Sequence, residues 1–299
     1  MKRFSTSLLS IAFVFVLVIP GNAADKSQFF DSDGVKIHFV EKGEGEPVVL
    51  IHGFAASYQM NWAMPGILDE LAENYRVIAI DNRGHGKSGK PHETEKYGLN
   101  MVEDVVRLMD HLEIEKAHIV GYSMGGFITT KLVATHPDRV ASAVIGAAGW
   151  HENAEERLAL LDEIGDSLEA GTGITPLMKA LNPEGQPMPS EQQLKTTNQM
   201  LMLLNDPKAL AAAIRGMHNL NVTRDQLESN KVPALSVIGA IDPLKDGVDE
   251  MSQVMNNLNV VVIDGADHMT AIDNPLLIGS IQEHLKKYSM MPTALGVGQ

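Results

Sequence analysis

The chain has 299 residues, of which 44% are hydrophobic and 21% charged, a globular composition that excludes collagen, coiled-coil and disordered proteins. Its 38 acidic and 24 basic side chains give a net charge of -14, which would repel a nucleic acid. The absence of cysteine excludes disulfides, metal-thiolate sites, a cysteine nucleophile and the lipidated cysteine of bacterial lipoproteins.

Residues 1–23 have the pattern of a secretory signal peptide. The basic start Met1-Lys2-Arg3 precedes an apolar run over 8–19, and small residues follow up to Ala23. The apolar run is shorter than the ~20 residues that span a bilayer, which disfavours a membrane anchor. We predict cleavage near Ala23 and a secreted or periplasmic protein with no stable membrane anchor.

From residue 24 to 150, short apolar runs alternate with amphipathic segments. A helix is predicted over 99–112, because hydrophobic residues recur at helical spacing after Asn100, an expected N-cap with Glu103 three residues later. This alternation predicts an α/β fold with a mostly parallel central sheet flanked by helices. The expected strands are 35–40, 47–51, 75–80, 117–121 and 140–145.

Residues 151–222 interrupt this pattern with successive helical segments and no clear buried strand. We interpret them as a helical cap inserted into the core. The core is expected to resume over 223–288, with strands at 234–238 and 260–263 and a closing helix at 276–285. Residues 289–299 have little periodicity and are expected to form a flexible tail.

Ser123 is the strongest candidate for a catalytic residue. It is the centre of a GxSxG pattern from Gly121 to Gly125, directly after an apolar strand and before the helical run 127–134. A serine on such a strand-to-helix turn is exposed at the edge of the sheet, and the neighbouring amides of the helix N-terminus favour negative charge there.

A serine nucleophile needs a base and a group that orients this base. Asp242 and His268 each follow a predicted strand in the second half of the chain. Residues beyond the carboxyl ends of parallel strands converge on one edge of the sheet, so both can meet Ser123. We therefore predict a catalytic triad of Ser123, Asp242 and His268.

Four motifs in order resemble those of α/β-hydrolase fold proteins of the esterase and lipase type with a helical cap, over residues 28–287. They are His52-Gly53-Phe54, the DNRGHGKS segment at 81–88, GYSMGG at 121–126, and the loops of Asp242 and His268. The resemblance implies that the backbone amides of Phe54 and Met124 form the oxyanion hole, a role that two preorganised donors suit.

Other polar residues near these motifs have alternative interpretations. Asp246 and Asp267 are rivals of Asp242 as the orienting acid, although both fit less well. His52 and His85 are interpreted as structural residues of the loops around the site. His151 and His218 flank the insertion and could line the pocket. No metal spacing is present, and no cofactor is expected.

The reaction expected from these residues is hydrolysis of carboxylic esters through an acyl-enzyme. Similar folds with aspartate at the nucleophile position are dehalogenases and epoxide hydrolases, and Ser123 disfavours both chemistries. A carbon-carbon bond hydrolase, lactonase, thioesterase, perhydrolase or non-catalytic binding protein stays open.

The substrate is expected to be a small or medium ester. The net charge argues against an anionic one. Methionines such as Met200, Met202 and Met217 either form an adaptable acyl pocket or fill the core.

Overall fold

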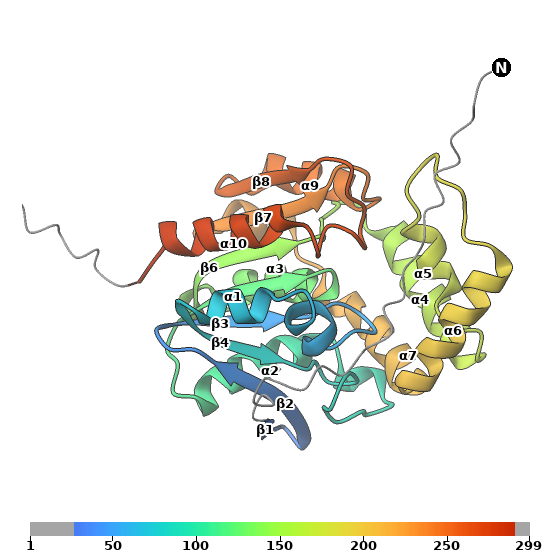
Figure 1. The fold of residues 1–299 in the computed structure, drawn as a ribbon, viewed down its shortest axis with the longest axis horizontal. Coiled ribbons are helices and arrows are strands. Elements are labelled where there is room, and N and C mark those ends of the chain that lie inside the picture. Colours follow the sequence, from blue (N-terminus) through green and yellow to red (C-terminus); the bar gives the residue numbers. More distant parts are fainter. Residues whose placement is uncertain (1–26, 291–299) are drawn as a thin grey trace, which may run out of the picture.

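The structure is a computed structural model that describes residues 27–290, so the predicted signal peptide and residues 291–299 lie outside the described residues. Its centre is an eight-stranded sheet with the strand order β1-β2-β4-β3-β5-β6-β7-β8 (Figure 1). The strands are β1 Gln28–Ser32, β2 Val35–Lys42, β3 Glu46–Ile51, β4 Tyr75–Ile80, β5 Ala117–Tyr122, β6 Val140–Gly146, β7 Ala234–Gly239 and β8 Leu258–Ile263.

The predicted mostly parallel sheet is confirmed, since β4, β3, β5, β6, β7 and β8 pair in parallel. The antiparallel strands are β1 and β2, at one edge. The edge strand β1 was not predicted as a strand, although it contains two consecutive phenylalanines, Phe29 and Phe30.

Helices cover both faces of the sheet. The longer helices are α1 Ile67–Ala72, α2 Leu99–His111, α3 Met124–Thr135, α4 Glu155–Glu169, α5 Thr175–Ala180, α6 Glu191–Leu204, α7 Pro207–Gly216, α8 Arg224–Glu228, α9 Lys245–Val254 and α10 Pro275–Lys287. Short helical turns also occur within residues 27–290, at Gln59–Ala63, Thr94–Lys96, Pro137–Arg139 and Met217–Leu220. None of the described helices is long and apolar enough to cross a membrane.

Two apolar cores lie on opposite sides of the sheet. Successive residues of β3 alternate between them: Val48 packs with Leu68 of α1 and Ile281 of α10, whereas Val49 belongs to the core that contains α2 and α3. This alternation follows from the two-residue period of a strand. Because both faces are covered, the central strands are almost continuously hydrophobic.

The prediction that Asn100 is the N-cap of α2 is wrong. The helix begins at Leu99, and its N-cap is Gly98, with φ 64° and no side-chain cap. The side-chain amide of Asn100 instead donates a hydrogen bond to the Glu95 carbonyl, 3.0 Å away. A Cβ on Gly98 would lie 2.6 Å from the carbonyl oxygen of Gly216, so close packing requires glycine at the cap.

Residues 147–233, between β6 and β7, form the helices α4 to α8 and no strand. Figure 1 shows α4 to α7 grouped together at one end of the sheet. The buried face of α4, with Leu161, Ile164 and Leu168, packs in the same core as Leu210 of α7. In contrast, α6 has no buried residue, and its Met200 is 40% exposed.

The last described residues pack on the core. Ser289 and the backbone N–H of Met290, both in the segment expected to be a tail, donate hydrogen bonds to the carboxylate of Glu46 at the start of β3. The helix α10 therefore ends against the amino end of the sheet.

Candidate active site

Ser123 lies in the turn between β5 and α3, where its backbone has φ 55° and ψ -116°. A non-glycine residue with this φ is strained, and the surroundings must hold it in place. The Ser123 N–H donates to the carbonyl oxygen of Gly146, 2.8 Å away. A Cβ on Gly121 would lie 2.0 Å from Gly125 O, and one on Gly125 would lie 2.0 Å from Ile51 O. Both glycines of the motif are therefore required by the packing.

The side chains of Ser123, His268 and Asp242 form one chain of hydrogen bonds. The Nε2 of His268 lies 3.0 Å from Ser123 Oγ, and its Nδ1 lies 2.9 Å from Asp242 Oδ2. His268 is 4% exposed and Asp242 is 3% exposed. The structure thus brings the three predicted residues together, in the arrangement by which an imidazole removes a serine proton.

Further hydrogen bonds hold the last two of these residues in place. The Oδ1 of Asp242 accepts the N–H of Leu244, 2.9 Å away. The hydroxyl of Tyr122, next to the serine, donates to the carbonyl oxygen of His268, 2.8 Å away. The sequence analysis did not identify Tyr122, although it lies within the GYSMGG motif. Both contacts restrict how far the imidazole can move relative to Ser123.

Among the described residues, neither rival acid forms a hydrogen bond with the His268 imidazole. Asp267 accepts hydrogen bonds from the N–H groups of Met269 and Thr270, 2.9 and 2.8 Å away, and so organises its own loop. Asp246 lies in the first turn of α9. Of the acids considered, the imidazole hydrogen-bonds with Asp242.

The two histidines near the insertion form ion pairs elsewhere. His151 Nδ1 lies 2.7 Å from Glu250 Oε2, and His218 Nε2 lies 3.1 Å from Asp162 Oδ1. Neither histidine contacts the Ser123 triad. The insertion's methionines differ in burial: Met217 is 3% exposed and packs in the core, Met202 is partly buried, and Met200 is exposed.

The expected oxyanion donors are the backbone amides of Phe54, in the loop that contacts the serine, and of Met124, the next residue along the chain. A Cβ on Gly53 would be 3.2 Å from Ser123 Cβ, so the loop after β3 lies directly against the nucleophile. Met124 is the first residue of α3, and its N–H has no acceptor within the helix. Within residues 27–290, the Phe54 N–H likewise has no hydrogen-bond acceptor. Two donors are thus free to bind an oxyanion.

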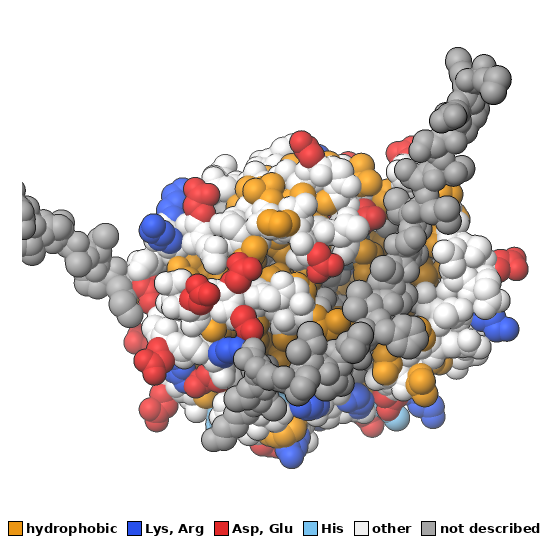
Figure 2. Space-filling model, in the orientation of Figure 1, with side chains coloured by type: hydrophobic (Ala, Val, Ile, Leu, Met, Phe, Trp, Pro, Cys, Tyr) orange, Lys and Arg blue, Asp and Glu red, His pale blue; other side chains and the backbone are white. Residues whose placement is uncertain are grey.

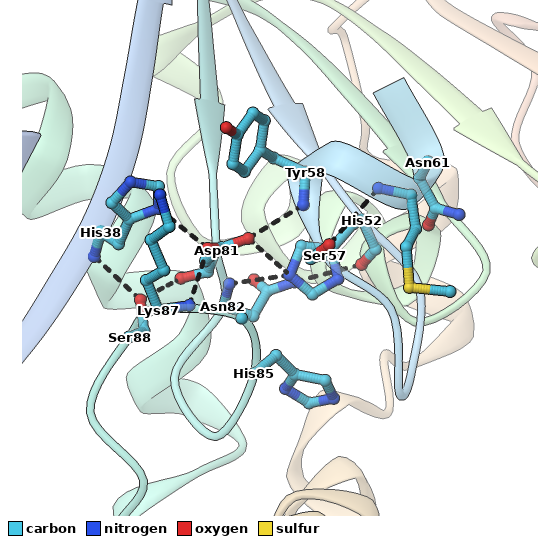
Figure 3. A network of polar contacts seen from close by, with 12 residues as sticks. His38, His52, Ser57, Tyr58, Asn61, Asp81, Asn82, His85, Lys87 and Ser88 are labelled. Atoms are coloured by element: carbon cyan, nitrogen blue, oxygen red, sulfur yellow. Dashed lines mark hydrogen bonds and ion pairs between the residues drawn. The ribbon is translucent and has the colours of Figure 1, made fainter. Parts of the chain in front are cut away.

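His52 is buried behind this loop. Its Nδ1 lies 2.7 Å from the carbonyl oxygen of Gly53, and its Nε2 accepts the Asn82 N–H at 3.0 Å (Figure 3). Since Nε2 is an acceptor, Nδ1 carries the proton and donates it to Gly53. Burial lowers the pKa of His52, which keeps the ring neutral. Asn82, not identified by the sequence analysis, thus selects the tautomer.

Asp81 joins the loops around His52 (Figure 3). Its carboxylate lies 2.8 Å from His38 Nδ1 and accepts the N–H groups of Tyr58 and Lys87, each 2.9 Å away. Burial alone would raise the pKa of Asp81. The hydrogen bonds lower the pKa by more than burial raises it, so the pKa lies below its usual value. A charged carboxylate is therefore the form that this network binds.

His85 also lies next to the oxyanion loop. Its Nδ1 is 3.0 Å from the carbonyl oxygen of Arg83, and its ring packs edge-on against Phe54. Burial lowers the pKa of His85 to about 3, so its ring is neutral. Like His52, it contacts loop backbone and does not contact Ser123.

The chain matches known proteins in two ways. Residues 46–170 match the family model of the alpha/beta hydrolase fold. A putative 2-succinyl-6-hydroxy-2,4-cyclohexadiene-1-carboxylate synthase of Bacillus subtilis is 27% identical over 270 residues, which cover 84% of this chain and 94% of that protein. Similarity therefore extends over most of the described chain.

Other similarities are more local or structural. The dihydrolipoyllysine-residue acetyltransferase component of the acetoin cleaving system of Cupriavidus necator is 41% identical over 131 residues, but the matched region covers 43% of this chain and 34% of that relative. A thermophilic esterase from Thermogutta terrifontis has a similar structure, with a TM-score of 0.70, 24% identity, and coverage of 89% of this chain and 99% of the esterase.

Proposed function

Because the chain belongs to the α/β-hydrolase fold superfamily, we propose that it is a serine hydrolase that cleaves carboxylic esters through an acyl-enzyme. The observation that carries this proposal is the hydrogen-bonded chain from Ser123 Oγ through His268 to Asp242. The two amide donors beside the serine, Phe54 and Met124, support the same reaction.

In the first half of the reaction, Ser123 Oγ attacks the ester carbonyl carbon and His268 Nε2 accepts the serine proton. The carbonyl oxygen becomes an oxyanion that the Phe54 and Met124 amides bind. As the intermediate collapses, the ester C–O bond breaks, and His268 returns the proton to the departing alkoxide. The products of this half are an alcohol and an acyl group on Ser123.

In the second half, a water molecule attacks the acyl carbon while His268 removes its proton. The bond to Ser123 Oγ breaks, the serine regains its proton from His268, and the acid leaves. Asp242 accepts the Nδ1–H throughout and stabilises the imidazolium that forms twice in the cycle.

Labelling with a fluorophosphonate tests the nucleophile, because only an activated serine reacts quickly with this probe. We expect mass spectrometry to find the adduct on the peptide that contains Ser123, and Ser123→Ala to abolish both labelling and hydrolysis of p-nitrophenyl esters. Labelling that persists in Ser123→Ala would contradict the assignment. A lactone and a ring-cleavage dienoate in the same assays distinguish the ester hydrolase from a lactonase or a carbon-carbon bond hydrolase.

We also propose that residues 151–222 act as a cap over Ser123. Two contacts support this role: Arg157 of α4 lies over the ring of Phe127, and Lys131 Nζ donates to the carbonyl oxygen of Asn221. Phe127 and Lys131 both belong to α3, the helix that starts next to the serine.

Export of the protein is a further proposal, based on the sequence of residues 1–23. N-terminal sequencing of the protein from its producing cells tests this location. Cleavage near Ala23 is expected, and a cytoplasmic protein that retains Met1 would contradict it.

A further inference from the structure

One stripe of α3 is only partly buried. Ser123, Phe127 and Lys131, four residues apart, are intermediate in exposure, whereas the residues between them are buried. At 1.5 Å per residue, Phe127 lies about 6 Å and Lys131 about 12 Å along the helix from the serine. This stripe leads from the nucleophile towards the insertion.

Two cations meet over the far part of this stripe. The guanidinium carbon of Arg157 lies 5.1 Å from the centre of the Phe127 ring. Arg157 Nη2 donates to Asn221 Oδ1, and Lys131 Nζ donates to the backbone carbonyl oxygen of the same residue, both at 2.6 Å. Asn221 therefore accepts a hydrogen bond from each cation and holds the two side chains next to each other.

Neither cation has an acidic partner. Within residues 27–290, no carboxylate lies within 4.0 Å of Arg157 or Lys131, although the chain carries 38 acidic side chains. Figure 2 shows acidic side chains spread over the face in view. Other arginines of the described chain do pair with carboxylates, as Arg139 does with Asp110 and Arg224 with Glu152. In particular, the buried Nη1 of Arg157 has no hydrogen-bond partner among the described residues.

Such an arrangement is costly unless an anion joins it. A partly buried cation loses hydration, and an unsatisfied N–H adds a further cost of roughly 1–3 kcal/mol. Burial lowers the pKa of both Arg157 and Lys131, which is the effect of lost hydration without a compensating charge. A ligand carboxylate would supply the missing charge and the missing acceptor.

We propose that Arg157 and Lys131 form a carboxylate-binding subsite for an ester whose acyl chain ends in a carboxylate several carbons from the scissile carbonyl. This inference rests on the proposed ester hydrolysis at Ser123 and names its substrate class. The net charge of -14 argued against an anionic substrate, but the charge beside this stripe is positive, so the proposal reverses that expectation. A guanidinium and an ammonium side by side favour a carboxylate over a neutral group of the same shape.

Hydrolysis of two esters that differ only in charge tests the subsite. The substrates are monomethyl adipate and the corresponding amide, methyl 5-carbamoylpentanoate. We expect the kcat/KM ratio of acid ester to amide ester to fall by about tenfold or more in Arg157→Gln and in Lys131→Gln. Arg157→Lys keeps the charge and should retain part of the ratio.

Arg215→Gln is the matched control. It removes one charge from the insertion at a residue paired with Asp166 and Glu169, and the kcat/KM ratio of the two esters should not change.

A binding measurement separates this inference from the proposed function. Calorimetry on the Ser123→Ala variant measures binding without turnover. We expect adipate to bind to this variant and adipamide not to bind. Adding Arg157→Gln should abolish the binding of adipate. If both esters are cleaved without discrimination and adipate does not bind, the subsite is refuted while ester hydrolysis stands. If adipate binds through Arg157 but no ester is cleaved, the subsite stands and the proposed function fails. If Arg157→Gln does not fold, Lys131→Gln in the same two assays decides.

Discussion

The Nδ1–H of His52 donates to the carbonyl oxygen of Gly53, 2.7 Å away, and this carbonyl belongs to the peptide unit whose N–H is that of Phe54. In a trans peptide, C=O and N–H point in opposite directions. Holding the oxygen against His52 therefore directs the Phe54 N–H the other way, towards the face of the loop on which Ser123 lies. A buried histidine thus sets the orientation of an expected oxyanion donor without contacting the substrate.

Replacing His52 should therefore affect turnover more than substrate binding. We expect His52→Ala to lower kcat by about 10²-fold, as for loss of an oxyanion donor, with a change in KM of less than threefold. Steady-state kinetics on a p-nitrophenyl ester measure both values. His118→Ala is the control, since His118 is also fully buried but pairs with Glu46 at the other end of β3. Equal losses of kcat in the two variants would indicate general damage to the fold.

The two carboxylates near the end of β7 should differ in their importance. Asp242→Asn is expected to keep the fold and to lower kcat by about 10⁴-fold, because the amide no longer selects the histidine tautomer that accepts the serine proton. Asp246→Asn should change kcat by less than about tenfold. Circular dichroism checks the fold of each variant. The reverse order of effects would make Asp246 the acid of the triad.

Phe127 should limit the length of the acyl chain, since it occupies the middle of the stripe that starts at Ser123. Phe127→Ala is expected to raise the kcat/KM ratio of octanoate to butyrate p-nitrophenyl esters by roughly tenfold. Met200→Ala is the control, because Met200 is 40% exposed on α6. If Met200 rather than Phe127 controls the profile, the acyl group extends along the outer side of the insertion.

The free energy of unfolding should decrease in acid, partly because of His284. This residue is 5% exposed in α10, and burial lowers its pKa from 6.5 to about 4. Its pKa is lower in the folded protein, so the unfolded chain binds more protons between these values. The contribution of neutral His284 to the free energy of unfolding is therefore complete above pH 6.5 and is lost as the pH falls towards 4.

His284→Leu should remove this contribution. The loss of stability between pH 7 and pH 4.5, measured by urea unfolding, should be smaller than in the wild type by on the order of 2 kcal/mol. Gln282→Leu on the same helix removes no titrating group and should follow the wild-type dependence. An unchanged pH dependence in His284→Leu would show that other groups cause the loss.

The sequence predicted the strands around Ser123 and the meeting of Ser123 with His268 because both depend on simple rules. An apolar run, a glycine-bounded turn and a helical pattern are local signals, and the carboxyl ends of parallel strands always share an edge. The roles of these residues in catalysis remain predictions. That Ser123, Asp242 and His268 lie close together could be predicted from the strands that they follow.

Features that depend on distant contacts could not be predicted in this way. Asn100 has the residue type of a cap, but Gly98 takes that position because the backbone of Gly216 packs against it. Similarly, nothing near Arg157 in the sequence indicates that its Nη1 lacks a partner among the described residues, since the side chain that accepts its Nη2 hydrogen bond, Asn221, comes from the end of the insertion. Such pairings follow from tertiary packing and have no local pattern.

The parallel pairing of β6 with β7 has a consequence for synthesis and folding. The strand β6 ends at Gly146, yet its neighbour in the sheet begins at Ala234, after the whole of residues 147–233. A growing chain therefore exposes the open edge of β6 until the insertion has been made, and Ser123 meets neither Asp242 nor His268 before β7 and β8 dock. The hydrogen-bonded chain of Ser123, His268 and Asp242 therefore cannot form until the strands that follow the insertion have been synthesised.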